Sequence, residues 1–289
     1  MPEKLRRQEL SVRSGSLTLI LVFLCTSSLL AQSRDLAGIA HVAFRVRDAE
    51  KSRDFYRSLG FEQAFEFSEP GKPPVFYIKV NDRQFIELYG RSGNDQQSGL
   101  LHVCYEVADI DKLWNEYSKL GLNPTASRKA RAGNLLFTLR DPEGQLLEYT
   151  QYLPGSLHYE DRGKHLGEHR ISQHLARVAV PVDNLRAAEL FYASKLAFQR
   201  GGASVATCLL LPGNSGDEVE LEAATPSARP RLDFAVAHLA QAADYLRVWG
   251  IPSRANDDSV AVTDPDGVVI LFILEKDHFQ NETGVKPRL

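Results

Sequence analysis

Long apolar runs, cysteine and net charge are all scarce in this chain. The most compact apolar run, residues 17–25, is shorter than the roughly 20 residues that a membrane-spanning helix needs. Three cysteines in 289 residues are too few for a disulfide framework, so apolar burial must hold each domain together. The formal net charge of −3 gives no reason to expect nucleic acid as a partner.

The first 31 residues have the layout of a secretory signal peptide. A basic start that includes Arg6 and Arg7 precedes the apolar run, and Ala31 follows as a cleavage position. We therefore expect residues 1–31 to direct export to the periplasm or the medium, and the mature protein to be free of the membrane. Leu29 is larger than a cleavage site prefers, so an uncleaved anchor is the alternative.

The remaining chain repeats itself. Residues 39–61 and 175–198 each read as an apolar strand, a polar turn and an amphipathic helix containing Phe-Tyr. The spacing from His41 to Phe55 equals that from Arg177 to Phe191. Residues 100–122 and 231–251 form a second matching pair, and an Asp-Pro-acid-Gly turn follows each, at 141–144 and 264–267.

The repeating unit is a strand, a helix and then several strands, which predicts an α+β fold. The four copies are 39–90, 100–152, 175–224 and 231–275. Helices are expected at 48–59, 109–120, 184–196 and 239–249, with Gly60 and Gly121 ending the first two. Later strands are expected at 75–80, 85–90, 135–140 and 146–152. The copies group into domains at 36–152 and 174–275.

Residues 153–173 break the pattern and predict a polar connector on the surface. Three histidines occur in it, and we interpret them as solvated because no carboxylate accompanies them in strand phase: His158, His165 and His169. Residues 276–289 are expected to be a polar tail. Cys104 and Cys208 fall in candidate strands of different domains, which predicts buried free thiols.

Strand parity places four metal-binding side chains on one face of the first domain. Successive residues of a strand point to opposite faces, and the apolar members of each strand suit the helix-covered side. The residues left for the other face include His41, Glu87, His102 and Glu148. Arg45, Tyr89 and Glu106 share this face and are substrate-binding candidates.

Two neutral imidazoles and two carboxylates carry a charge of −2, which one divalent cation cancels. The set contains no sulfur and leaves open positions on a six-coordinate ion, which indicates a catalytic site. Nitrogen and oxygen donors admit Ni, Co, Zn, Fe or Mn. A lone strand His or Glu is usually structural, but four at matching phases in two repeats favour one bound metal ion.

The segment HVAFRVRDAEKSRDFYRSLGF, residues 41–61, resembles the N-terminal pattern of glyoxalase I, and the DPEG turn before Glu148 is similar to its second half. The chain is thus identified as a member of the vicinal-oxygen-chelate superfamily. This resemblance implies four βαβββ modules in two domains with curved mixed sheets. It also implies a divalent metal on His41, Glu87, His102 and Glu148, an enediolate stabilised by the metal, and Glu148 as the proton-transferring base with Glu87 as its counterpart.

The second domain departs from the pattern. Its equivalent positions hold Arg177, Glu220, Asp233 and Leu271, so we expect no metal site there, and an ion pair between Arg177 and Asp233 if the two meet.

Three functions stay open for the first domain. One is a glyoxalase-like lyase or isomerase acting on a small oxygenated substrate. Another is an extradiol-type dioxygenase, although Thr138 stands where that family has a Tyr, and residues 103–157 contain no His. The third is a non-catalytic small-molecule binder of the resistance type, whose members usually lack the full ligand set. A homodimer is a further expectation.

Overall fold

The computed structural model describes residues 36–93, 97–201, 207–226 and 228–275. The predicted signal peptide (1–31) and tail (276–289) lie outside the described residues. In the part that is described, the elements follow four times the order strand, helix, three strands, which confirms the α+β class and the four modules.

The first two modules run from β1 to β8. Their elements are β1 (Leu36–Val46), α1 (Ala49–Ser58), β2 (Glu62–Phe67), β3 (Val75–Lys79), β4 (Phe85–Gly90), β5 (Gly99–Val107), α2 (Ile110–Lys119), β6 (Arg128–Lys129), β7 (Leu135–Arg140) and β8 (Leu146–Gln151). A short helix, α3 (Leu157–Glu160), follows in the connector.

The last two modules repeat this order from β9 to β16. Their elements are β9 (His174–Val182), α4 (Leu185–Lys195), β10 (Gln199–Arg200), β11 (Thr207–Leu210), β12 (Glu218–Ala223), β13 (Arg231–Val236), α5 (Leu239–Val248), β14 (Arg254–Ala255), β15 (Ser259–Thr263) and β16 (Val269–Leu274).

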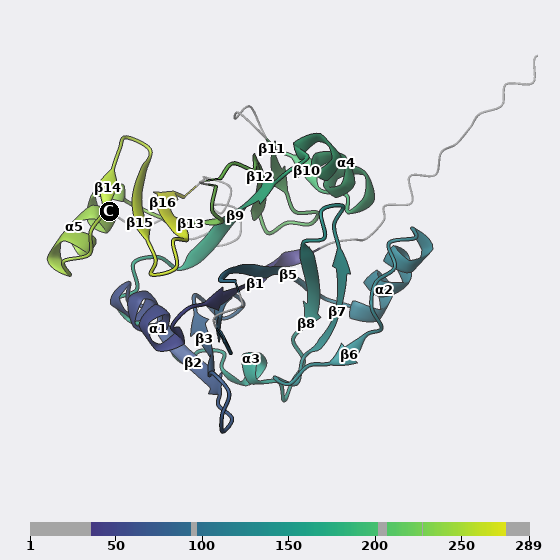
Figure 1. The fold of residues 1–289 in the computed structure, drawn as a ribbon, viewed down its shortest axis with the longest axis horizontal. Coiled ribbons are helices and arrows are strands. Elements are labelled where there is room, and N and C mark those ends of the chain that lie inside the picture. Colours follow the sequence, from purple (N-terminus) through teal and green to yellow (C-terminus); the bar gives the residue numbers. More distant parts are fainter. Residues whose placement is uncertain (1–35, 94–96, 202–206, 227, 276–289) are drawn as a thin grey trace, which may run out of the picture. The chain divides into compact units, whose positions relative to one another are not determined.

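Each pair of modules forms one eight-stranded mixed sheet. The strand order of the first is β2-β3-β4-β1-β5-β8-β7-β6, and the second repeats it as β10-β11-β12-β9-β13-β16-β15-β14. The modules join where β1 pairs antiparallel with β5, while β1–β4 and β5–β8 are parallel pairs. Figure 1 shows the first sheet curving around the space in which α3 lies, with α1 and α2 on the outside of the curve.

Local chemistry explains where the helices begin and end. The side chains of Asp48, Asp109 and Asn184 each accept a hydrogen bond from a backbone N–H in the first turn of α1, α2 and α4. Gly60 has a positive φ of 83° just after α1. A Cβ at Gly60 would lie 2.5 Å from the carbonyl oxygen of His169, so this glycine also lets the connector pack closely.

The helix-facing side chains of the central strands form the core, as parity predicts. Val42, Phe44 and Val46 of β1 are at most 1% exposed and belong to one hydrophobic cluster with the helices. Cys104 and Cys208 are buried free thiols, which confirms that expectation. In the described residues, no helix is both long and apolar enough to span a membrane.

The connector is not the solvated loop that its composition predicts. Ser156, His158 and Asp161 are buried, whereas His165 and His169 are exposed as expected. The fully buried Lys79 of β3 donates from Nζ to Asp161 Oδ2 at 2.8 Å, which fixes the end of α3 against the sheet. A polar sequence therefore packs inside because distant residues supply its partners.

Candidate metal centre

The four side chains that parity selects come from the four central strands of the first sheet. His41 lies on β1, Glu87 on β4, His102 on β5 and Glu148 on β8. All four are buried, with exposed fractions between 2% and 9%.

His41 Nε2 lies at the middle of this group. It is 3.0 Å from His102 Nε2, 3.4 Å from Glu87 Oε1 and 3.3 Å from Glu148 Oε1. Donor atoms bound to one ion at about 2.1 Å are separated by roughly 3.0–3.4 Å at adjacent octahedral or tetrahedral positions. Each of the other three donors is therefore close enough to His41 Nε2 to share a cation with it. Among the described residues, two sets of three have all their donor atoms within 4.8 Å of one another: His41, Glu87 and His158, and His41, Cys104 and Glu148.

Burial controls the protonation of these groups when no cation is bound. It lowers the pKa of His41 to about 3 and that of His102 to about 4, so both imidazoles are neutral at pH 7. Burial, with the neighbouring charge of Glu148, raises the pKa of Glu87 to about 8. Burial also raises the pKa of Glu148. Burial thus makes ionisation of both carboxyl groups unfavourable when no cation is bound.

A divalent cation fits this donor set. It would cancel the charge of two ionised carboxylates and use imidazoles that are already neutral. Nitrogen and oxygen donors in this ratio suit Mn, Fe, Co, Ni or Zn, as the sequence predicts.

A cavity of about 270 Å³ opens beside the four donors. Its apolar wall is formed by Phe67, Val75, Tyr77 and Leu136, and its polar wall includes Tyr89, Arg128, Arg131 and Asn134. The hydroxyl of Tyr89 donates to Glu87 Oε2 at 2.8 Å. Tyr89 therefore both lines the cavity, as expected of a substrate-binding residue, and orients a candidate ligand.

Two other substrate-binding candidates do not line this cavity. Glu106 accepts a hydrogen bond from Arg83 Nε at 2.7 Å, so its partner is Arg83. Arg45 is half-buried, and it is not among the described residues that line the cavity. Parity gives the correct face for both, but the face extends beyond the cavity.

Sequence reasoning missed His158. This residue lines the cavity, and a donor atom of His158 lies within 4.8 Å of donor atoms of His41 and Glu87. The only local signal is Ser156, a helix N-cap residue type that begins α3. The burial of the ring depends on aromatic residues of distant strands, which no sequence window contains.

The strand register corrects one equivalence in the second sheet. Cys104 pairs with His41 in the first sheet, and Asp233 pairs with Arg177 in the second, so Asp233 corresponds to Cys104. The position of His102 is held by Arg231. The predicted alignment was wrong by two residues, an error that the alternation of apolar residues cannot reveal because a shift of two keeps every side chain on its face.

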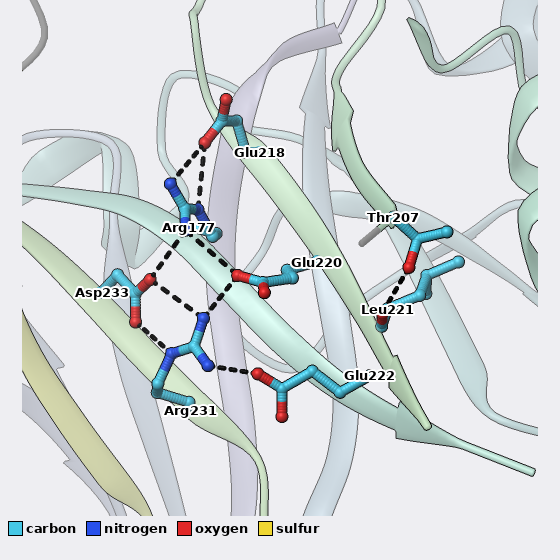
Figure 2. A network of polar contacts seen from close by, with 8 residues as sticks. All are labelled: Arg177, Thr207, Glu218, Glu220, Leu221, Glu222, Arg231 and Asp233. Atoms are coloured by element: carbon cyan, nitrogen blue, oxygen red, sulfur yellow. Dashed lines mark hydrogen bonds and ion pairs between the residues drawn. The ribbon is translucent and has the colours of Figure 1, made fainter. Parts of the chain in front are cut away.

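Guanidinium groups thus stand at the positions of both imidazoles in the second sheet. Figure 2 shows Arg177 and Arg231 among four carboxylates, those of Glu218, Glu220, Glu222 and Asp233. Arg177 Nη1 is 3.0 Å from Glu220 Oε2 and 3.4 Å from Asp233 Oδ2, which confirms the expected pairing with Asp233. Fixed cations of the chain itself neutralise the carboxylates here.

Comparison with known proteins identifies the first domain. The family model of the Glyoxalase/Bleomycin resistance protein/Dioxygenase superfamily matches residues 38–149. No curated protein sequence matches the chain.

Solved structures share the fold across most of the chain. The Mn(II)-bound glyoxalase from Novosphingobium aromaticivorans is 16% identical, with 83% of each chain covered and a TM-score of 0.63. The 2,3-dioxygenase LapB from Pseudomonas sp. KL28 is 13% identical, with 83% of this chain and 93% of that chain covered and a TM-score of 0.62. A catechol 2,3-dioxygenase is 17% identical, covers 84% and 94% of the two chains, and has a TM-score of 0.60. The family-model match places residues 38–149 in the Glyoxalase/Bleomycin resistance protein/Dioxygenase superfamily, and the second sheet repeats the same architecture.

Proposed function

We propose that this protein is a divalent-metal-dependent enzyme that acts on a small oxygenated substrate by glyoxalase-like lyase or isomerase chemistry. One observation carries the proposal: three donors, from Glu87, His102 and Glu148, lie within 3.4 Å of His41 Nε2 beside a cavity large enough for a small molecule.

The two carboxylates have different surroundings, which assigns them different roles. Both carboxylates border the cavity, but Glu87 is 3% exposed and accepts a hydrogen bond from the Tyr89 hydroxyl, whereas Glu148 is 8% exposed. Glu148 is therefore the group that moves a proton to and from the substrate, and Glu87 is its fixed counterpart. A bound cation supplies electrostatic stabilisation of negative charge on substrate oxygen. A positioned base contributes typically 10²–10⁴-fold to rate.

Extradiol-type ring cleavage is the second candidate. The dioxygenase structures match more than four-fifths of this chain. The cavity also contains an imidazole and a phenol that the sequence pattern did not predict there, from His158 and Tyr77, beside the predicted Tyr89. Non-catalytic binding is the third candidate, and the complete set of four donors favours an enzyme over it.

Export of the mature protein is part of the proposal, and a homodimer stays a prediction.

Metal analysis of the purified mature protein, combined with turnover assays, tests this proposal. We expect roughly one divalent ion per chain in the wild type and a strong loss in Glu87→Ala and His102→Ala. Glu106→Ala is the matched control, because Glu106 shares the face but pairs with Arg83 outside the cavity wall.

Turnover separates the candidates. Hemithioacetals turned over without catechols would support glyoxalase-like chemistry, and the reverse would support ring cleavage. A wild-type protein with substoichiometric metal, or with full metal and no turnover of either substrate class, would contradict the proposed enzyme and leave the binding function.

A further inference from the structure

His158 is buried in an aromatic enclosure. Its ring stacks on Tyr152 with centroids 4.5 Å apart and meets Phe85, Phe65 and Tyr77 edge-on at 4.9, 5.0 and 5.5 Å. The residue is 2% exposed, and neither ring nitrogen has a hydrogen-bond partner among the described residues. Buried polar atoms are nearly always paired, so these nitrogens need a partner that the described residues do not supply.

The ring also lies at the candidate metal centre. A nitrogen of His158 lies within 4.8 Å of a ring nitrogen of His41 and a carboxylate oxygen of Glu87. Two donors on one ion are at most about 4.2 Å apart, twice a bond of about 2.1 Å. A displacement of less than roughly 1 Å would therefore let His158 share an ion with His41 and Glu87.

The connector holds His158 in this place. The backbone N–H of Leu157 donates to the Ala132 carbonyl at 2.8 Å, and Asp161 receives the buried Lys79 ammonium at 2.8 Å. Residues on both sides of His158 are thus tied to the sheet. The imidazole is part of a fixed wall of the cavity and does not belong to a free loop.

We propose that His158 is a fifth protein ligand of the metal ion, so that the centre contains three imidazoles and two carboxylates. This inference rests on the proposed metal site and extends it to the connector. With five protein donors, a six-coordinate ion keeps one open position in place of two. The connector then takes part directly in setting how many substrate atoms can approach the ion.

The full-length mature protein loaded with cobalt(II) tests this inference. Each imidazole bound to the paramagnetic ion gives one strongly shifted, solvent-exchangeable N–H proton resonance. We expect three such resonances in the wild type and two in His158→Phe, whose ring suits the aromatic enclosure. Cobalt affinity should fall about 10-fold or more in His158→Phe. His169→Ala, a change of an exposed histidine in the same connector, should keep all three resonances.

The outcomes are distinct. Two resonances in the wild type, or an unchanged spectrum and affinity in His158→Phe, would overturn the role of His158 while leaving the four-donor site intact. A wild type that binds no cobalt would remove the proposed function as well. Thermal melting of the metal-free proteins separates loss of a ligand from misfolding, and His158→Gln serves as a second substitution. The loss of one resonance and of cobalt affinity must persist in a variant that melts at the same temperature as the wild type.

Discussion

At the scale of single residues, Tyr89 links the cavity to the metal centre. Its hydroxyl donates to Glu87 Oε2 at 2.8 Å, while Oε1 of the same carboxylate faces His41 Nε2 at 3.4 Å. The phenol therefore occupies one oxygen and leaves the other directed at the imidazoles. Groups that orient ligands in this way tune the affinity of a metal site without touching the ion.

Tyr89→Phe should consequently weaken metal binding by about 10–100-fold with unchanged stoichiometry, because Glu87 loses the contact that fixes its rotamer. Competition with a chelator of known affinity measures the change. Tyr159→Phe, a substitution on α3 of a tyrosine whose ring lies under Arg162, should leave the affinity unchanged. An unaltered affinity in Tyr89→Phe together with a raised KM would show that Tyr89 contacts the substrate instead.

Strand parity predicts the face of a residue but not its position along that face. His41, Glu87, His102 and Glu148 follow from alternation because each lies on one of the four central strands. Arg45 and Glu106 have the same parity, but they lie beyond the cavity wall as described. Depth within a curved sheet depends on register and twist, which are tertiary properties.

At the scale of elements, α3 owes its position to tertiary contacts. A helix of four residues has almost no intrinsic stability. Lys79 Nζ is fully buried and lies 2.8 Å from Asp161 Oδ2 and 3.0 Å from Asp82 Oδ1. The two acids differ in burial, since the side chain of Asp161 is 7% exposed and that of Asp82 is 44% exposed.

This difference predicts unequal costs for the same chemical change. Asp161→Asn removes the buried counter-charge of a buried ammonium and should lower the free energy of unfolding by about 3 kcal/mol. Asp82→Asn removes a half-exposed partner and should cost under about 1 kcal/mol. Urea denaturation of both variants provides the comparison, and equal costs would refute the assignment of Asp161 as the main anchor of α3.

The repeated elements could be predicted from sequence, whereas α3 could not. Helices α1, α2, α4 and α5 carry their signals locally, in apolar periodicity and in cap residues such as Asp48 and Asp109, and a glycine follows α1, α2 and α5. The connector lacks this apolar periodicity. It is anchored to the sheet by Lys79, which lies more than seventy positions earlier in the chain and donates to Asp161. Such long-range pairing leaves no trace in a local window.

At the scale of the whole molecule, the two sheets contact each other through reciprocal turns. The acid at the third position of each Asp-Pro-acid-Gly turn accepts a backbone N–H just before a helix of the other sheet: Glu143 from Asp183 at 2.6 Å, and Asp266 from Arg47 at 3.0 Å. The repeat that is visible in the sequence is thus also a repeat of contacts.

The first aspartate of each turn also contacts a helix of the other sheet. Tyr192 donates from its hydroxyl to Asp141 Oδ2, and Tyr56 donates to Asp264 Oδ2, both at 3.4 Å. These tyrosines are the second members of the two Phe-Tyr pairs that the sequence repeats. Their position in the sequence therefore follows from a polar contact between the sheets as well as from helix amphipathicity.

Burial at this contact makes stability depend on pH. It raises the pKa of Asp264 to about 6, compared with about 3.9 in an unfolded chain. Below pH 4 the Asp264 carboxyl is protonated in the folded and the unfolded state, so it does not change the free energy of unfolding. Between pH 4 and 6 the unfolded state loses its proton first, so the folded state becomes less stable as pH rises. The shift of roughly 2 units corresponds to about 2–3 kcal/mol.

Asp264→Asn should remove this dependence, because the amide oxygen can still accept from the backbone N–H groups of Asp266 and Val268 without ionising. Urea denaturation at pH 4, 5, 6 and 7 should show the wild type losing about 2–3 kcal/mol relative to Asp264→Asn across this range. Tyr56→Phe should keep the loss, because burial is the largest cause of the raised pKa and a hydrogen bond donated by the tyrosine would lower that pKa. Parallel pH profiles for the wild type and Asp264→Asn would mean that Asp264 is already ionised in the folded protein and that the contact with Tyr56 is charged.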